Sequence, residues 1–140
     1  MRSTERFTGL ANIYGQARPT YPPELVRWCL EQAPLPQLIV DLGCGTGIST
    51  RLFATTGHPV LGIDPNADML ATARAEGAQD YRVGTSEQTG LPDACADLII
   101  AAQAFHWFDL HRTFAEVERI GTTRSACVAF WNCLLYTSPS

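Results

Sequence analysis

An acid and three closely spaced glycines are the residues of this 140-residue chain whose types and spacing most clearly indicate chemistry. Asp41 is followed by glycines at the alternate positions 43, 45 and 47. Because glycine lacks a Cβ atom, such a loop can adopt unusual backbone angles and approach a ligand closely. A carboxylate just before the first glycine would repel a phosphate and would suit a cationic group such as an ammonium. The spacing therefore indicates a loop that binds a small molecule.

Two other kinds of glycine loop do not match this stretch. The dinucleotide fingerprint needs a glycine at position 48, where Ile48 stands. The phosphate-binding P-loop needs a Gly-Lys pair, and the chain contains no lysine. A glycine-rich turn with a purely structural role is the remaining alternative.

The residues on either side of the loop predict the elements that a nucleotide-type site needs. The apolar run Leu38-Ile39-Val40 predicts a strand that is buried on both faces. After the loop, Ile48, Leu52 and Phe53 are spaced as one face of a helix. Strand, glycine turn and helix start are the context in which such a loop binds a ligand.

A second acid occupies the end of the next predicted strand. The apolar run Val60–Ile63 ends at Asp64. An acid about 20 residues beyond a glycine loop commonly accepts hydrogen bonds from ribose hydroxyls. Asp64 is therefore predicted to bind a ribose. The alternative is a helix cap, for which Asn66 is better placed.

Apolar runs and turn residues predict one α/β domain. Strands are predicted at residues 38–40, 60–63, 81–83, 96–102 and 126–131, and helices at residues 23–33, 48–56, 67–76 and 110–120. Strands that alternate with helices at spacings of about 20 residues form right-handed βαβ units and a parallel sheet. Two helices are predicted to bury apolar stripes, namely Met69, Leu70 and Ala73 in one and Leu110, Phe114, Val117 and Ile120 in the other.

Composition and charge argue against several classes of function. The ten basic residues are all arginines, scattered along a chain of net charge −4, so neither a nucleic-acid partner nor a membrane-surface role is supported. The five cysteines form no C-x-x-C pair, so neither a disulfide framework nor a metal site is expected. No hydrophobic signal region opens the chain, and its longest aliphatic run, Leu98–Ala102, is too short to span a bilayer. A cytoplasmic location is the resulting expectation.

The stretch Asp41-Leu42-Gly43-Cys44-Gly45-Thr46-Gly47 resembles motif I of the class I S-adenosylmethionine-dependent methyltransferases. The resemblance implies that the loop cradles the methionine part of S-adenosylmethionine and that Asp41 contacts its amino group. The loop residues expected to bind the cofactor are Gly43, Cys44, Gly45, Thr46 and Gly47. The implied fold is a doubly wound, Rossmann-like and mostly parallel sheet with strand order 3-2-1-4-5 and the later strands missing.

The same resemblance implies where the rest of the cofactor lies. Asp64 and Pro65 are expected at the ribose, Thr85 and Ser86 at the adenine, and Gln103 in the loop after the fourth strand. Family members often place an acid where Thr85 stands, so that contact is expected to be weaker. The backbone of Ser86 could still meet the edge of the adenine ring.

The methyl acceptor is expected beside the loop after the fourth strand. The segment Gln-Ala-Phe-His-Trp-Phe-Asp at residues 103–109 resembles the sequences of a subgroup that includes trans-aconitate methyltransferase-like proteins. His106 titrates near neutrality and is the candidate general base. The expected acceptor-binding residues are Phe105 and Trp107 in this loop and Tyr14, Arg18 and Tyr21 in an arm before motif I. Core packing of the aromatics and a plain surface lead-in for the arm are the alternatives.

The implied reaction is transfer of a sulfonium methyl group to an oxygen, nitrogen or carbon nucleophile of a small-molecule acceptor. A nicotinamide-dependent oxidoreductase on a similar fold and a non-catalytic cofactor-binding module are the alternatives. The oligomeric state is left open.

The last residues of the chain do not share the family resemblance of the residues before them. Residues 133–140 resemble the translation of a sequencing adapter, and the family resemblance stops at Asn132. Residues 1–132 are therefore expected to form an incomplete methyltransferase domain and residues 133–140 a non-native tail.

Overall fold

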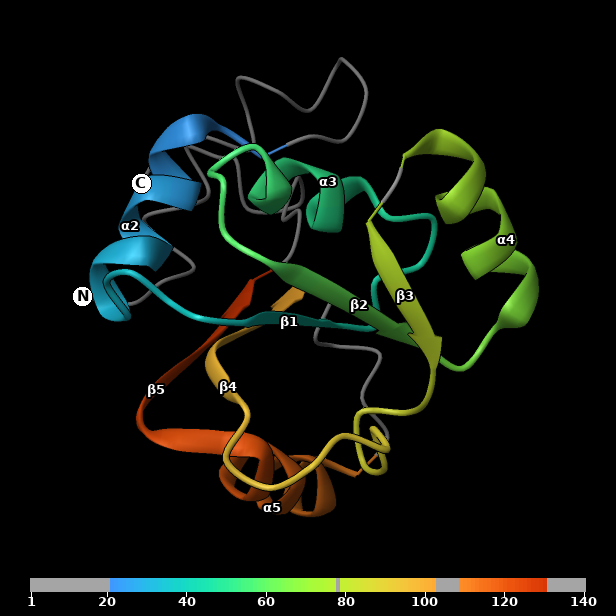
Figure 1. Ribbon diagram of the computed structural model, residues 1–140. Helices are drawn as coiled ribbons and strands as arrows, with labels where there is room; N and C mark the ends of the chain where they lie inside the picture. Colours follow the sequence, from blue (N-terminus) through green and yellow to red (C-terminus); the bar gives the residue numbers. More distant parts are fainter. Residues whose placement is uncertain (1–20, 78, 103–108, 131–140) are drawn as a thin grey trace, which may run out of the picture.

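The computed structural model describes residues 21–77, 79–102 and 109–130, which form one open sheet with helices on both faces (Figure 1). The helices are α2 (Pro23–Gln32), α3 (Ile48–Ala54), α4 (Ala67–Glu76) and α5 (Leu110–Ile120). The strands are β1 (Ile39–Leu42), β2 (Val60–Asp64), β3 (Asp80–Val83), β4 (Ala96–Ala102) and β5 (Gly121–Phe130).

The sheet is parallel throughout, and its strands lie in the order β3-β2-β1-β4-β5. The predicted strand order is thus confirmed. β1 is central, with Val40 opposite Leu61 of β2 on one side and Ile99 of β4 on the other. Every residue of β1 and β4 is buried, which explains why their sequences are near-continuous apolar runs.

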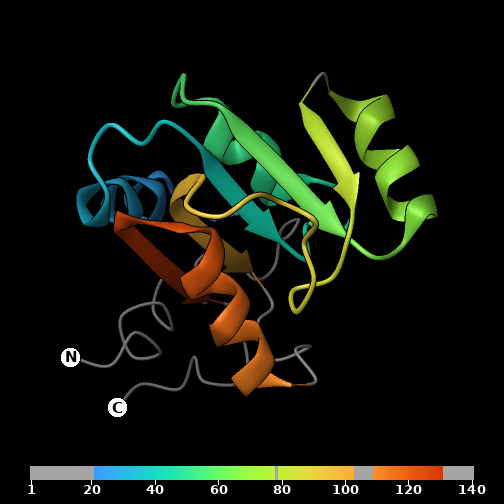
Figure 2. The same ribbon diagram turned by 60° about the horizontal axis from the view of Figure 1, so that its bottom comes forward.

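Two hydrophobic layers hold the helices to the sheet. In Figure 1, α2, α3 and α4 lie above the sheet and α5 lies below it, and Figure 2 brings α5 forward. The upper layer joins Leu25 and Cys29 of α2 and Phe53 of α3 to the strands. The lower layer joins Ile120 of α5 and Leu91 of the β3–β4 loop to the other face. The domain is therefore doubly wound, as predicted.

Side-chain caps fix the starts of two helices. The Asn66 side chain accepts hydrogen bonds from the backbone N–H groups of Asp68 and Met69, and the Asp109 side chain accepts one from Arg112. The predicted Asn66 cap is confirmed, and each of the two caps satisfies N–H groups that have no partner within the first turn of the helix.

The predicted apolar stripe of α5 is confirmed for Ile120, which is buried, and for Val117, which packs against the core, but it is wrong for Leu110 and Phe114. Leu110 and Phe114 are 52% and 58% exposed, while Thr113, Glu116 and Ile120 form the buried face. The reason is that α5 packs partly against a polar loop, which offers hydrogen-bond partners to Thr113 and Glu116. In α4, Leu70 and Ala73 are buried as predicted, but Met69 is 43% exposed.

The fifth strand begins at Gly121, earlier than the predicted start at Ala126. Gly121 pairs with Ala96 and Ala126 pairs with Leu98, so the residues between them form an irregularity in the ladder. The Thr122 hydroxyl donates to the buried Asp97 carboxylate at 2.7 Å, which holds this polar stretch against the sheet.

No helix among the described residues is long and apolar enough to cross a membrane. The same residues contain no group of three or more His, Cys, Asp or Glu side chains that could hold a metal ion.

Candidate functional site

The predicted site residues gather at the carboxyl edge of the sheet. β1 runs into the glycine loop at residues 43–47, β2 ends at Asp64, and β3 ends at Val83 before Thr85 and Ser86. The strand order reverses between β1 and β4, and ligands of open α/β sheets bind at the carboxyl ends of strands beside such a reversal. The glycine loop therefore lies where this fold binds small molecules.

The glycines of the loop have two different functions. Gly45 has a φ of +58°, and a Cβ atom there would meet nothing within 4 Å, so the space beside it is open. Gly47 has a φ of +88°, and a Cβ atom there would collide with the Tyr81 hydroxyl. Gly45 thus leaves room for a ligand, whereas Gly47 allows close packing of the loop on β3.

The end of β2 fixes the shape of the loop. The backbone N–H groups of Gly43 and Cys44 both donate to the Ile63 carbonyl, at 2.7 and 3.0 Å. The Cys44 side chain is buried, and burial raises the pKa of its thiol to about 12. Because a thiol with so high a pKa stays protonated at neutral pH, Cys44 packs as a small side chain and is not a nucleophile.

Asp41 is fully buried beneath the loop, and only one of its two carboxylate oxygens has hydrogen-bond partners among the described residues. Its Oδ2 atom accepts hydrogen bonds from the Ser49 hydroxyl at 2.6 Å and the Thr50 hydroxyl at 2.7 Å. Its Oδ1 atom has no hydrogen-bond partner in the part of the chain that the structure describes. Burial, with a smaller contribution from the nearby Asp64, raises the pKa of Asp41 to about 6, against the opposing effect of the two hydroxyls. An unpartnered buried carboxylate oxygen is the complement of a cationic group.

Asp64 connects the loop to the start of α4. Its Oδ2 atom accepts from the Gly45 N–H at 2.9 Å, and its Oδ1 atom accepts from the Asn66 N–H at 2.8 Å. Each carboxylate oxygen has two lone pairs, so both oxygens keep an acceptor site for a further donor. Pro65 is exposed beside it at the same edge. The carboxylate can thus position the loop and still receive a hydroxyl group.

The remaining described candidates lie in the turns next to this edge. The Thr46 carbonyl accepts a hydrogen bond from the Arg51 guanidinium at 2.9 Å. Thr85 and Gln88 exchange backbone hydrogen bonds at 3.0 and 3.2 Å, which closes a tight turn after β3. The Ser86 hydroxyl lies 3.2 Å from the Thr113 hydroxyl of α5, which donates to it. The turn that carries Thr85 and Ser86 is therefore attached to α5.

Tyr21 packs against Phe130, the last residue of β5. Its ring meets the Phe130 ring edge to face, with centroids 4.8 Å apart and an angle of 80° between the planes. It is one of the partly buried side chains on the α2 side of the core. Six predicted site residues lie outside the described residues, namely Tyr14, Arg18, Gln103, Phe105, His106 and Trp107.

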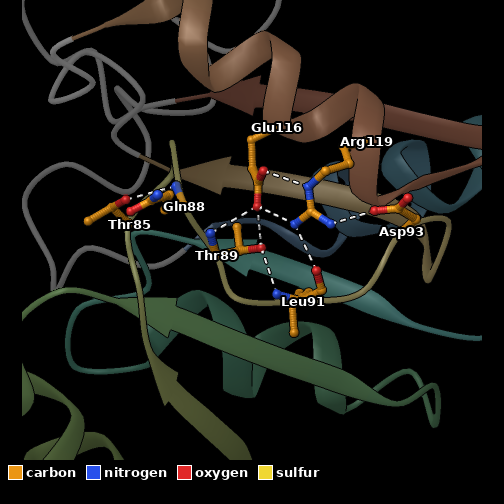
Figure 3. Close-up of polar contacts among 7 residues, drawn as sticks. All are labelled: Thr85, Gln88, Thr89, Leu91, Asp93, Glu116 and Arg119. Carbon is orange, nitrogen blue, oxygen red and sulfur yellow. Dashed lines mark hydrogen bonds and ion pairs between the residues drawn. The ribbon is translucent and has the colours of Figure 1, made fainter.

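Sequence reasoning missed two groups that support the site. Ser49 and Thr50 donate hydrogen bonds to Asp41. The sequence feature that could have identified them is the pair of adjacent hydroxyl residues at the start of a helix. Glu116 and Arg119 hold the β3–β4 loop through Thr89 and its neighbours, as Figure 3 shows. Nothing in the sequence of α5 marks these two residues, because Thr89, the hydrogen-bond partner of the buried Glu116, is 27 positions away in the chain.

A cavity of about 460 Å³ lies at the opposite edge of the sheet. Its lining includes Leu38, Val60, Asp80 and Cys95, which stand at the amino ends of β1, β2, β3 and β4. This cavity is therefore separate from the glycine loop, because the amino and carboxyl ends of parallel strands lie at opposite edges.

Comparison with known proteins identifies the relatives of this chain. Residues 40–128 match a family model described as a methyltransferase domain. A methyltransferase of uncharacterised activity from Mycobacterium tuberculosis is 35% identical over 127 residues, covering 90% of this chain and 51% of that protein. A probable S-adenosylmethionine-dependent methyltransferase from Saccharomyces cerevisiae is 32% identical, covering 84% of this chain and 43% of that protein.

A solved structure gives the same result. A proposed type II methyltransferase from Anaeromyxobacter dehalogenans superposes with a TM-score of 0.74 at 39% identity, covering 81% of this chain and 48% of that one. The chain spans about half the length of the curated relatives that it matches.

Proposed function

We propose that this chain, which belongs to the class I S-adenosylmethionine-dependent methyltransferases, transfers the methyl group of that cofactor to an oxygen, nitrogen or carbon nucleophile of a small-molecule acceptor. The observation that carries the proposal is the Oδ1 atom of Asp41, which is buried beneath the glycine loop and has no hydrogen-bond partner among the described residues. S-adenosylmethionine has an ammonium group at its methionine end, so the residues present fit the cofactor of the family.

Different described residues are proposed to bind different parts of the cofactor. Asp41 would receive the ammonium, and the loop residues Gly43, Cys44, Gly45, Thr46 and Gly47 would cradle the methionine part. Asp64 and Pro65 would hold the ribose, and Thr85 and Ser86 the adenine. Gln103 is proposed to complete this set. The cofactor supplies an activated methyl group, and the chain supplies position and exclusion of water.

The acceptor side of the proposal rests on the sequence. Phe105 and Trp107, with Tyr14, Arg18 and Tyr21, are proposed to bind a small molecule of the kind used by trans-aconitate methyltransferase-like proteins. A carboxylate acceptor would need no base, whereas a hydroxyl or an ammonium acceptor would have to lose a proton, for which His106 is the candidate. A cytoplasmic location, and the division into a domain at residues 1–132 and a tail at residues 133–140, stay predictions.

Two measurements on the purified protein test this function. Titration calorimetry with S-adenosylhomocysteine, the demethylated product, should detect binding, and NAD should give none. Incubation of S-adenosylmethionine with a pool of small metabolites should then release S-adenosylhomocysteine. Binding without turnover in any pool would favour the non-catalytic module, and binding of NAD alone would favour the oxidoreductase.

Replacing Asp64 with alanine is expected to weaken binding of S-adenosylhomocysteine by about 1–3 kcal/mol, because a hydrogen bond to a charged group is lost at the ribose. Calorimetry on Asp64→Ala measures the change. Asp68→Ala is the control, because Asp68 is exposed in the first turn of α4. Equal affinity of Asp64→Ala and the unaltered protein would refute the ribose role.

Replacing His106 with alanine is expected to reduce turnover about 10²- to 10⁴-fold if the acceptor must lose a proton, because a general base contributes that much. The affinity for S-adenosylhomocysteine should stay nearly constant. His111→Ala, which changes an exposed histidine of α5, is the matched control. A fall in cofactor affinity as large as the fall in turnover would show a structural role for His106.

A further inference from the structure

The loop that joins β3 to β4 has no helix or strand of its own, yet hydrogen bonds attach it to α5 at three successive points, of which Figure 3 shows the two made by Glu116 and Arg119. Thr113 donates to Ser86 at 3.2 Å, and Glu116 accepts from Thr89. Arg119 donates to the Leu91 carbonyl and to Asp93, both at 2.7 Å. These α5 residues are spaced about one helical turn apart and so share a face.

Glu116 is the centre of this network. It is 8% exposed, and its Oε2 atom accepts from the Thr89 N–H at 2.9 Å, the Thr89 hydroxyl at 2.6 Å and Arg119 at 2.7 Å. Its Oε1 atom accepts from Arg119 Nε at 2.9 Å. The paired hydrogen bonds from Arg119 and those from Thr89 lower the pKa of Glu116 to about 2, so the carboxylate is charged at neutral pH. A buried charge with this many donors fixes the geometry around it closely.

The position of Thr89 in turn determines the position of the turn after β3. Thr89 is 2% exposed, and its backbone oxygen lies so near Gly84 that a Cβ atom on Gly84 would be 2.8 Å from it. Gly84 also donates its N–H to the Asp64 carbonyl at 3.1 Å. The next residue, Thr85, closes the turn with Gln88. A displacement of Thr89 would therefore move Gly84 and the turn that carries Thr85 and Ser86.

We propose that Glu116 and Arg119 are positioning residues for the adenine end of the cofactor. They hold Thr89, Thr89 fixes the turn at residues 84–88, and that turn presents its backbone to the adenine ring. The inference rests on the proposed function, because it takes the turn as the adenine site. It adds that α5, through its hydrogen bonds to the loop, determines how well the base is recognised.

The test compares two ligands that differ only at the base. S-adenosylhomocysteine carries an amino group on its purine, and S-inosylhomocysteine carries a carbonyl oxygen at the same place. Calorimetry on the unaltered protein should show that the adenine form binds more tightly. Glu116→Gln keeps an acceptor for Thr89 but loses the charge that pairs with Arg119. It is expected to weaken S-adenosylhomocysteine binding about tenfold, or about 1.4 kcal/mol, and S-inosylhomocysteine binding much less.

The matched control is Glu118→Gln, an exposed acid on the same helix, which should leave both affinities unchanged. Arg119→Lys is a second, milder variant, because lysine keeps the charge but cannot form the paired hydrogen bonds. It should lower the preference for adenine in the same direction. Melting curves establish that each variant is folded before its affinities are compared.

The outcomes separate the inference from the function on which it rests. Failure of the unaltered protein to bind S-adenosylhomocysteine would overturn the proposed function. Tight binding without any preference for adenine would overturn only the inference, since the turn would then not recognise the base. An equal loss of affinity for both ligands in Glu116→Gln and Arg119→Lys would also overturn it, because that is the result of a general structural role.

Discussion

An Asp41→Asn variant should be more stable than the unaltered protein at pH 7 and should bind the cofactor more weakly. The physical reason for both effects is the buried carboxylate, whose Oδ1 atom has no partner among the described residues. Asparagine can still accept the hydroxyl hydrogen bonds of Ser49 and Thr50 through its own oxygen. It has no charge to bury and none to offer to an ammonium group.

The stability effect depends on pH in a defined direction. Burial raises the pKa of Asp41 from its ordinary value of 3.8 to about 6 in the folded chain. Between these values the folded state binds more protons than the unfolded state, so the unfolding free energy of the unaltered protein falls as the pH rises. A shift of about 2 units corresponds to a loss of about 3 kcal/mol, complete above pH 6. The Asp41→Asn variant has no carboxyl group to ionise at this position, so its unfolding free energy does not fall in this way.

Urea unfolding at pH 4 and pH 7 measures the first effect. The variant should gain about 2 kcal/mol relative to the unaltered protein between the two pH values, because most of the loss falls in that range. An unpaired amide donor would cost the same at both pH values and so does not alter this difference. Calorimetry with S-adenosylhomocysteine measures the second effect, an expected loss of about 1.5–3 kcal/mol from one charged hydrogen bond. Asp80→Asn, at an exposed position that begins β3, is the control for both. Unchanged affinity in Asp41→Asn would show that the unpartnered oxygen does not face the ammonium.

Gly47→Ala should destabilise the domain far more than Gly57→Ala, although the two glycines have nearly identical φ angles of +88° and +87°. Alanine in this left-handed region costs about 1–2 kcal/mol at either position. At Gly57 a Cβ atom would meet nothing within 4 Å, so no further cost arises. At Gly47 it would overlap the Tyr81 hydroxyl and lie 3.1 Å from the Ala73 Cβ atom.

Relief of that overlap requires the loop or β3 to move, because Tyr81 and Ala73 are both buried. Forcing an extra methyl group into a packed interior typically costs about 1–3 kcal/mol. The expected total for Gly47→Ala is therefore about 2–5 kcal/mol, against about 1–2 for Gly57→Ala. Urea unfolding of the two variants side by side isolates the packing contribution. Equal losses would mean that the glycine loop is not packed on β3 as described.

The fold could be predicted because its signals are local. Apolar runs overlap both β1 and β4, and Asn66 and Asp109 stand where α4 and α5 need caps. The start of β5 could not be predicted in the same way. Thr122 and its polar neighbours extend the strand only because Asp97, distant in the sequence, gives the Thr122 hydroxyl a buried partner.

The buried face of α5 was mispredicted for a related reason. Helical periodicity selects the apolar residues Leu110 and Phe114, but burial here follows hydrogen-bond partners as well as hydrophobicity. Glu116 is buried because Thr89, which is 27 positions away, supplies two donors to it. No pattern within α5 contains that information.

In the candidate site, too, the features that are local in the sequence could be predicted, whereas the contacts between distant residues could not. The spacing of Asp41 and the glycines predicts a loop for a cationic group, because both features are local in the chain, and that role stays a prediction. For Asp64 the sequence favours a ribose role over a helix cap, because Asn66 is better placed as the cap. In the structure Asn66 caps α4, while Asp64 holds the Asn66 N–H and the Gly45 N–H and keeps acceptor capacity.

The order of the strands also has a consequence for synthesis on the ribosome. β1 lies between β2 and β4, and no two neighbouring strands of the described sheet are antiparallel, so none of these strands can pair with a neighbour as a hairpin when the chain emerges. The side of β1 that pairs with β4 stays open until Ala96–Ala102 has been made. Pairing of distant parallel strands is slow, and an open apolar strand edge is a binding site for chaperones. A nascent chain of this protein therefore exposes its most central strand for longer than a sheet of hairpins of the same size would.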